Sequence, residues 1–268
     1  MKNGKGIIKE YSYYFNILEF KGEYLNGEKN GKGKEFYDNG NILFEGEYLN
    51  GKRNGKGKEY YYNFNLRFEG EYRQGKRWNG KGYDNQNNII YELKNGKGII
   101  KEYFSDGTLK FEGEYFNGKG KSYNSFGNLV YEGEYLNEEK HGKGKEFNKN
   151  GKIIFEGEYL YDQKRKGNEY NNGNLEFNGE YLYNKKWNGK GYDKNGNVVY
   201  ELINGNGKIK EYHLYCDKLL FEGEYLNGKR NGKGKMYSCN GNILSEGEYL
   251  NGKVNGKGKL YDIDVNGN

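Results

Sequence analysis

The chain has 268 residues, of which 33% are hydrophobic, 45 are glycine and none is proline, and its mean hydropathy is -1.20. These values exclude an ordinary aliphatic core, but 30 Tyr and 14 Phe residues also exclude the aromatic-poor composition of a disordered chain. The 44 basic and 38 acidic residues leave a formal net charge of +6, and this near balance argues against a dedicated nucleic-acid binder.

The N-terminal segment and the cysteines bear on location. Residues Met1–Tyr11 contain no apolar stretch of signal-peptide length, and no window approaches the roughly 18 apolar residues of a membrane span. We therefore expect a soluble, cytoplasmic chain. Cys216 and Cys239 are the only cysteines, and we expect two free thiols in a reducing compartment. With only His141 and His213 beside them, the sequence predicts no metal site and no cofactor.

One short unit recurs along the whole chain. Residues Phe44–Gly51 read Phe-Glu-Gly-Glu-Tyr-Leu-Asn-Gly, and each copy is followed by a Gly-Lys-Gly segment, an aromatic residue and Asn-Gly or a relative of it. The copies begin, in chain order, at Phe20, Phe44, Phe68, Tyr91, Phe111, Tyr131, Phe155, Phe177, Tyr200, Phe221 and Ser245. We expect one continuous array over residues 1–268, made of about eleven units of 20–24 residues.

The sequence also repeats with a second, longer period. Residues Lys76–Leu93 match Lys185–Leu202 at an offset of 109 residues, so blocks of several repeats were duplicated together. No distinct cap is visible at either end of the array. We expect the ends to be protected by a partner or by self-association through the sheet ends, or the chain to be one piece of a longer array.

Within a unit the pattern predicts strands and hairpins. Apolar and polar positions alternate through Phe44–Leu49, and Asn-Gly pairs favour hairpin turns. A two-residue turn at Asn39-Gly40 pairs Gly33 with Gly46, Lys34 with Glu45, Lys32 with Glu47 and Gly31 with Tyr48. A four-residue turn over Gly51–Asn54 pairs Glu47 with Lys58 and Tyr48 with Gly57. Both turns keep the same side-chain parity.

This register predicts two unlike faces. One face carries Phe44, Gly46 and Tyr48 beside Gly31, Gly33, Gly55 and Gly57, so that tyrosine rings lie over glycine. The other face carries Glu45 and Glu47 between lysines of the neighbouring strands. A single hairpin is marginal, so stability must come from stacking. The fold class we predict is all-β, an elongated single-layer antiparallel meander of tandem β-hairpins.

The sequence contains no arrangement that predicts catalysis. The glutamates recur in nearly every unit beside lysines on an open face, whereas general acid-base work needs carboxylates in a desolvated cleft. Gly55-Lys56-Gly57 lacks the ending of a phosphate loop and leads into a strand. The two histidines occupy non-matching positions of the repeat. We therefore expect no enzymatic activity and predict no catalytic residue.

The segment Phe44–Gly57, followed by an aromatic residue and Asn-Gly, resembles the MORN repeat (membrane occupation and recognition nexus), in the variant form in which Asn-Gly precedes the Glu-Gly-x-Tyr strand. The resemblance covers nearly the whole chain. It fails at Tyr91–Leu93 and Tyr200–Leu202, where glycine is replaced, and at Ser245, where the aromatic residue is absent; we expect those units to bend or twist differently. The resemblance implies a hairpin array that serves as a scaffold or binding surface, often beside a domain that carries any enzymatic activity.

Two surfaces are candidates for function. The first is the aromatic-glycine face, as a groove for peptides, although its rings would also serve simply to pack on neighbouring repeats. Its candidate residues are Phe44, Tyr48, Phe68, Tyr72, Phe111, Tyr115, Phe155 and Tyr159. The second is a basic rim at the longer turns, suited to anionic lipid or an acidic partner, or simply a solvated edge. Its residues are Lys52, Arg53, Lys76, Arg77, Lys164, Arg165, Lys185, Lys186, Lys229 and Arg230.

Three functional hypotheses follow. The first is a non-enzymatic scaffold that mediates protein-protein interactions through the aromatic-glycine face. The second is a peripheral membrane adaptor that binds anionic phospholipid through the basic rim; nucleic acid is disfavoured because the glutamates oppose a polyanion. The third makes the chain the repeat region of a larger enzyme or, as the resemblance to bacterial relatives implies, of an antitoxin-type immunity protein. The identity of a protein partner is not predicted.

Overall fold

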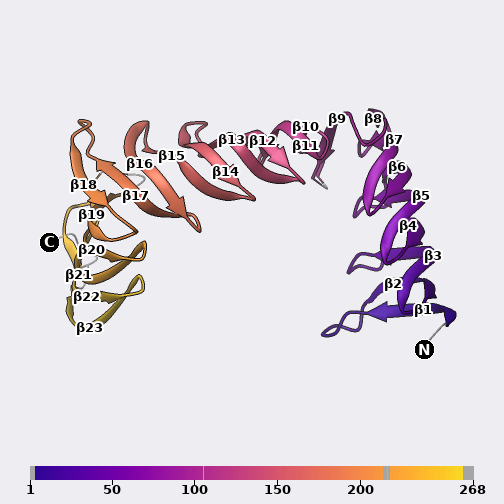
Figure 1. Ribbon diagram of the computed structural model, residues 1–268, viewed down its shortest axis with the longest axis horizontal. Coiled ribbons are helices and arrows are strands. Elements are labelled where there is room, and N and C mark those ends of the chain that lie inside the picture. The colour runs from indigo at the N-terminus through magenta and orange to yellow at the C-terminus, as the bar shows by residue number, and fades with distance from the viewer. Residues whose placement is uncertain (1–3, 105, 214–215, 217, 262–268) are drawn as a thin grey trace. The chain divides into compact units, whose positions relative to one another are not determined.

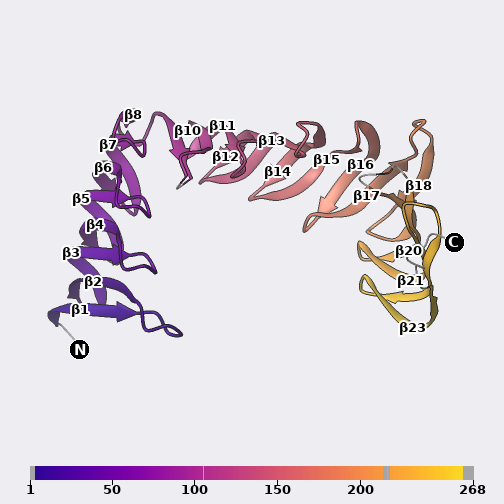
Figure 2. The same ribbon diagram turned by 180° about the vertical axis from the view of Figure 1, so that it is seen from behind.

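The computed structural model describes residues 4–104, 106–213, 216 and 218–261. Across these residues the regular structure is entirely β, with 23 strands and no helix (Figure 1). Neighbouring strands in each sheet pair antiparallel. They also follow one another in chain order, as the labelled strands of Figure 2 show. The predicted all-β antiparallel meander of hairpins is therefore confirmed.

Three sheets contain the strands. The first sheet holds β1 (Lys5–Tyr11), β2 (Leu18–Leu25), β3 (Glu28–Phe36), β4 (Ile42–Leu49), β5 (Lys52–Tyr60), β6 (Leu66–Arg73), β7 (Lys76–Tyr83) and β8 (Ile89–Leu93). The second holds β9 (Ile99–Tyr103), β10 (Leu109–Glu114), β11 (Asn117–Tyr123), β12 (Leu129–Leu136), β13 (Glu139–Phe147), β14 (Ile153–Leu160), β15 (Gln163–Asn171), β16 (Asn174–Leu182), β17 (Lys185–Tyr192) and β18 (Val198–Leu202). The third holds β19 (Gly207–Tyr212), β20 (Leu219–Leu226), β21 (Lys229–Tyr237), β22 (Ile243–Leu250) and β23 (Lys253–Leu260).

The chain divides into two compact units, Met1–Asn128 and Leu129–Asn268. Each unit has its own aromatic core. In the first unit the buried side chains run from Phe20 to Ile100, and in the second from Tyr131 to Tyr249. The single continuous array of about eleven units stays a prediction.

The register of the β3–β4 hairpin is the one the sequence predicts. Gly33 pairs with Gly46 and Lys34 with Glu45, and the other two expected pairs also form. The next turn differs from our expectation, because it contains two residues rather than four. Asn50 and Gly51 have φ values of 49° and 77°, which suits the tight hairpin turn that Asn-Gly favours.

The shorter turn shifts the β4–β5 pairing by two residues and creates a bulge. Gly46 pairs with Gly57, whereas Tyr48 pairs with Arg53, so extra residues of β5 lie opposite Glu47. Gly55 lies in this bulge with a φ of 95°, and a Cβ there would meet the Glu47 carboxylate at 2.0 Å. Gly55, and Gly31 in the equivalent bulge of β3, therefore do not lie under aromatic rings, and our placement of them on the aromatic face was wrong.

In the regular units the leading aromatic residue covers a pair of glycines. Phe44 is fully buried, and a Cβ at Gly57 would lie 2.5 Å from its Cζ atom. Tyr48 lies edge-on to Phe44 and to Phe20 of the previous unit, with ring centroids 5.6 and 5.3 Å apart. Rings do lie over glycine as expected, but the closest ring over the Gly46–Gly57 pair is that of Phe44.

The hydrogen-bonded ladder ends where the repeat loses its glycine. Leu93 takes the place of Gly46 and is 1% exposed, and β8, which contains it, is the last strand of the first sheet. Beyond it only the isolated bridge between Lys94 and Lys97 forms before β9. Leu202, 109 residues later, is also 1% exposed and lies in β18, where the second sheet ends. Both sheet boundaries therefore coincide with a leucine in the place of the glycine.

We expect Gly57→Ala to lower the free energy of unfolding by about 1–3 kcal/mol, because the added methyl group overlaps the Phe44 ring. Gly6→Ala is the matched control, since a Cβ at Gly6 meets nothing within 4 Å, and its effect should stay within about 0.5 kcal/mol. Urea unfolding followed by circular dichroism measures both. Equal stability of the two variants would contradict the assignment of Phe44 as the ring that requires glycine.

Candidate functional site

The aromatic residues expected to bind a partner lie mostly in the core. Six of the eight are buried, namely Phe44, Tyr48, Phe68, Tyr72, Phe155 and Tyr159. Phe111 and Tyr115 are partly buried and pack against the core of the first unit. The rings therefore pack on neighbouring repeats, and a binding role for them stays a prediction without an exposed groove to support it.

A cation lies over the leading ring in seven of the units. The Arg53 guanidinium lies 4.2 Å from the centroid of Phe44 and forms ion pairs with Glu35 and Glu59. We call the equivalent residues the inner cation row: Lys29 over Phe20, Arg53 over Phe44, Arg77 over Phe68, Lys140 over Tyr131, Lys164 over Phe155, Lys186 over Phe177 and Arg230 over Phe221.

This row corrects the predicted basic rim. Half of the ten rim residues belong to the inner cation row, namely Arg53, Arg77, Lys164, Lys186 and Arg230. The cause is the two-residue turn, which pairs Arg53 with Tyr48 and so sends its side chain to the core face. The other five are Lys52, Lys76, Arg165, Lys185 and Lys229, and the first three of them are exposed. Each of these turns therefore presents one outward cation of the pair instead of two.

The most buried ionic network surrounds Arg77, which is 6% exposed. Its guanidinium pairs with Glu59 and lies 2.9 Å from a Glu102 oxygen, and it also donates a hydrogen bond to the Tyr91 hydroxyl. Arg67 pairs with Glu102 from the other side at 2.8 Å. Burial by itself raises the pKa of Glu59, but the attraction and hydrogen bond of Arg77, together with the charges of Arg67 and Arg53, outweigh burial and lower that pKa to about 2. Every charge in this network has a partner, as burial requires.

Ring, cation and carboxylate form one structural set. The last hairpin tests this, because Ser245 replaces the ring there and Val254 pairs with Tyr249 where a cation stands in other units. The residues opposite Ser245 are Met236 and Leu260, in place of the two glutamates. The sequence analysis missed this set. A comparison of the repeats could have found it, because the ring, the cation and the carboxylates are all replaced in the last hairpin.

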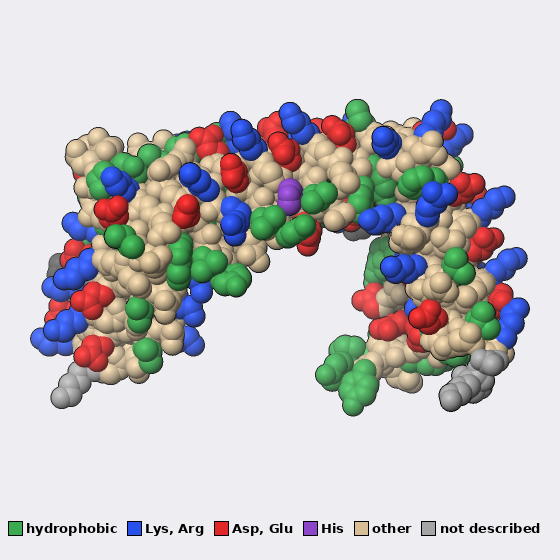
Figure 3. All heavy atoms as spheres, in the orientation of Figure 1, with side chains coloured by type: hydrophobic (Ala, Val, Ile, Leu, Met, Phe, Trp, Pro, Cys, Tyr) green, Lys and Arg blue, Asp and Glu red, His purple; other side chains and the backbone are tan. Residues whose placement is uncertain are grey.

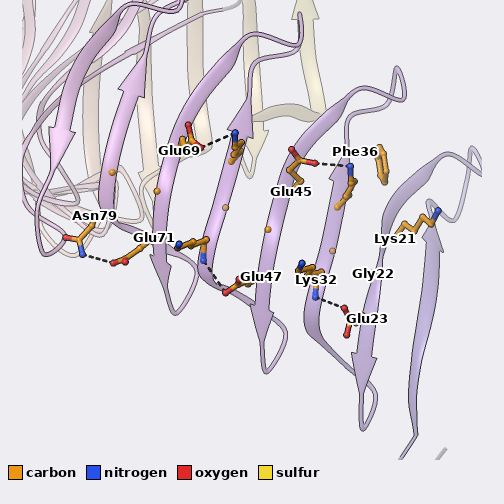
Figure 4. Close-up of a pocket in the computed structure, with 18 of the residues that line it drawn as sticks. Lys21, Gly22, Glu23, Lys32, Phe36, Glu45, Glu47, Glu69, Glu71 and Asn79 are labelled. Atoms are coloured by element: carbon orange, nitrogen blue, oxygen red, sulfur yellow. Dashed lines mark hydrogen bonds and ion pairs between the residues drawn. The ribbon is translucent and has the colours of Figure 1, made fainter.

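The opposite face of the first sheet contains a groove of about 1050 Å³ that crosses β2 to β7 (Figure 4). Its floor is the backbone of a row of glycines, and its walls are lysines and glutamates. We call it the glycine groove, and its floor residues are Gly22, Gly33, Gly46, Gly57, Gly70 and Gly80. The second unit has a similar groove of about 840 Å³ over Gly223, Gly234, Gly247 and Gly258.

Charge along the glycine groove alternates from strand to strand. One wall is neutralised within the sheet, for instance by the Lys34–Glu45 ion pair at 2.9 Å. On the other wall Glu47 accepts a hydrogen bond from the Lys56 backbone amide at 3.3 Å. Among the described residues, the ammonium groups of Lys32 and Lys56 have no carboxylate within the 4.0 Å of an ion pair, and both side chains are exposed. Figure 3 shows Lys/Arg and Asp/Glu side chains interspersed over the visible surface.

The cysteines are not free thiols. Cys216, which follows β19, and Cys239, which follows β21, form a disulfide with Cα atoms 5.9 Å apart. The two turns are 23 residues apart in sequence, about one repeat, and so lie on the same edge of the sheet. Our expectation of two reduced cysteines was wrong, because spacing in the sequence does not show that two turns are stacked.

In the part of the chain that the structure describes, no helix has the length and apolar character needed to cross a bilayer.

We expect Arg77→Met to lower the free energy of unfolding by about 3–5 kcal/mol, because it leaves Glu59 buried without its main partner. Lys52→Met removes the same charge from an exposed turn position and should change stability by less than about 0.5 kcal/mol. Urea unfolding at neutral pH compares the two variants. A cost for Arg77→Met no larger than that for Lys52→Met would show that the buried network does not stabilise the fold.

Acid should destabilise the first unit through Glu59. Its pKa lies near 4.5 in the unfolded chain and at about 2 in the fold, so its stabilising contribution is complete above about pH 5 and is lost as the pH falls towards 2. The contribution is on the order of 3 kcal/mol. Glu59→Gln should lower stability at pH 7 and flatten its dependence on pH in this window, as measured by urea midpoints. An unchanged slope would contradict the assigned pKa.

Comparison with known proteins agrees with the repeat pattern. The family model described as MORN repeat matches residues 20–42, 44–65, 131–152, 221–243 and 246–264. No curated protein matches the sequence. Among solved structures, "Crystal Structure of TcdB2-TccC3" is 9% identical with a TM-score of 0.20, covering 91% of this chain and 14% of that chain. A Photorhabdus luminescens Tc holotoxin pore structure is 13% identical with a TM-score of 0.18, covering 91% of this chain and 16% of that chain.

TM-scores of 0.20 and 0.18 are too low to support any statement about fold or function. This chain also spans less than a fifth of either protein. The five repeat matches lie in both compact units and coincide with consecutive hairpins of the sheets. MORN repeats generally mediate protein or membrane interactions, and the family is typically a non-enzymatic scaffold. With its matched repeats and its meander of β-hairpins, the chain belongs to the MORN repeat family.

Proposed function

We propose that the chain is a non-enzymatic scaffold that binds acidic, extended protein segments in its glycine grooves. The observation that carries the proposal is the glycine groove itself, a long channel with a backbone floor and two exposed lysines on one wall. The charged side chains of both walls flank this floor, so an extended segment can lie against the backbone between them. The aromatic-glycine face is filled by its own buried rings, so the opposite face is the better candidate for binding.

The spacing of the groove suits an extended ligand. Equivalent lysines, such as Lys32 and Lys56, lie two strands apart, which corresponds to about 9.6 Å. A polyproline II segment advances about 9.3 Å in three residues. A carboxylate at every third residue would therefore meet one lysine per repeat. The lysines favour an acidic ligand because the glutamates of the same wall already accept hydrogen bonds from the sheet, as Glu47 does from Lys56 and Glu23 from Lys32.

The other hypotheses have less support. A membrane adaptor needs a strongly basic rim, and five of the ten rim residues are engaged with core rings. The repeat region of a larger enzyme or immunity protein, and self-association through the sheet ends, stay predictions. A cytoplasmic location also stays a prediction, and the Cys216–Cys239 disulfide argues for an oxidising compartment instead.

The test uses a synthetic peptide, (Pro-Pro-Glu)4, labelled with a fluorophore and titrated with the full chain. Replacing Lys32 and Lys56 together by Gln should weaken binding about five- to tenfold, because two exposed charge contacts are lost. Fluorescence anisotropy measures the affinity. The double variant should keep the wild-type unfolding midpoint, since neither lysine has an ion-pair partner in the described fold.

Two controls separate the groove from general charge. The Lys52→Gln, Lys229→Gln double variant removes the same charge from the basic rim and should bind the peptide as the wild type does. A peptide of the same composition with its four glutamates in one block should bind more weakly than the periodic one. Equal loss of binding in both double variants, or equal affinity for both peptides, would refute binding in the groove. Binding to vesicles with anionic lipid that depends on Lys52 and Lys229 would support the membrane hypothesis instead.

A further inference from the structure

Three potential metal ligands converge at one edge of the third sheet. His213 and Cys216 lie in the turn after β19, and Cys239 lies in the turn after β21. One imidazole nitrogen and the two sulfur atoms all lie within 4.8 Å of one another. Among the described residues this is the only such group of three or more His, Cys, Asp or Glu side chains. His213 and Cys216 are partly buried and Cys239 is exposed, so the group is open to small solutes.

One hydrogen bond of His213 leaves a single nitrogen of its ring free to bind a metal. Its Nε2 atom lies 2.9 Å from the backbone carbonyl oxygen of Tyr237. A carbonyl only accepts hydrogen bonds, so Nε2 carries the proton and the lone pair of the neutral ring is at Nδ1. Metal-ligating histidines commonly donate their other ring N–H to a backbone carbonyl in this way. The Asn171 side-chain amide also donates a hydrogen bond to the His213 carbonyl at 3.3 Å, which holds the backbone of the turn.

The two sulfurs are joined in a disulfide, so they become ligands only after reduction. A dithiol reductant transfers two electrons and two protons to the disulfide, giving two cysteine thiols and an oxidised, cyclic reductant. Two thiolates and an imidazole are donors that suit Zn²⁺. Binding of Zn²⁺ then releases the two thiol protons, and a fourth coordination position stays open for water.

We propose that Cys216, Cys239 and His213 form a redox-controlled zinc site, closed as a disulfide under oxidising conditions and able to bind Zn²⁺ once a dithiol has reduced it. In either state the site links the turn after β19 to the turn after β21. The proposal is independent of the glycine groove, because it involves none of the groove residues.

The experiment uses the full chain and Co²⁺ as a spectroscopic substitute for Zn²⁺. The chain is reduced with dithiothreitol, freed of reductant without air and titrated with Co²⁺. We expect a thiolate-to-cobalt charge-transfer band and the visible bands of a tetrahedral site, at one Co²⁺ per chain, both removed by added Zn²⁺. The unreduced chain should show neither band. Absence of these bands from the reduced chain, or their presence in the unreduced chain, would overturn the proposal.

Two variants test the ligands, and a third serves as the control. Cys239→Ser should abolish the charge-transfer band, and His213→Gln should weaken Zn²⁺ binding by at least about tenfold. His141→Gln is the matched control, since it removes the other histidine of the chain, and its titration should equal that of the wild type. Circular dichroism checks that each variant is folded. Unchanged Zn²⁺ affinity in folded His213→Gln would remove the imidazole from the site and so refute it as proposed.

Discussion

The contact between an aromatic ring and a pair of glycines governs the rest of this structure. The Phe44 ring occupies the space above Gly46 and Gly57, where any Cβ atom would overlap it or the neighbouring backbone. The ring is thereby fully buried in a sheet only one layer thick. This arrangement supplies apolar burial without an aliphatic core, which is why a chain of such low mean hydropathy can fold. On the opposite face the side chains of Glu45 and Glu47 flank the backbone of Gly46, so the glycine groove lies between two rows of charged residues.

The charged residues divide into two populations with different tasks. Members of the inner cation row, such as Arg77, lie over core rings and pair with buried glutamates. A buried charge without a partner is costly, so a buried cation of the row and its carboxylates stabilise the fold only together. The hairpin with Ser245, Val254 and Met236 shows their joint loss. The outward lysines and glutamates sit in solvent, where each pair contributes little to stability and leaves the surface available for binding.

Departures from the repeat have structural consequences at defined places. Leu93 and Leu202 replace glycine, and the first and second sheets end in the strands that contain them. Residues 109 apart also repeat the local packing, since Phe68 stacks on Tyr91 and Phe177 stacks on Tyr200 with interplanar angles of 20° and 17°. A longer sequence period therefore positions the sheet boundaries. The disulfide and His213 likewise lie at one edge of the third sheet, where turns from successive repeats meet.

The sequence by itself determined the strands, the antiparallel meander and the β3–β4 register, and it marked Tyr91–Leu93 and Tyr200–Leu202, where the first two sheets end. It did so because the alternation of rings, glycines and charges is local and recurs many times. Only the tertiary structure decided which of two adjacent basic residues points inward, because a two-residue turn and a bulge set the parity of Arg53 against Tyr48. It also decided that Cys216 meets Cys239, and that the aromatic face is filled while the charged face is grooved. These outcomes depend on turn length and on the stacking of successive repeats, which bring together residues that no local pattern connects.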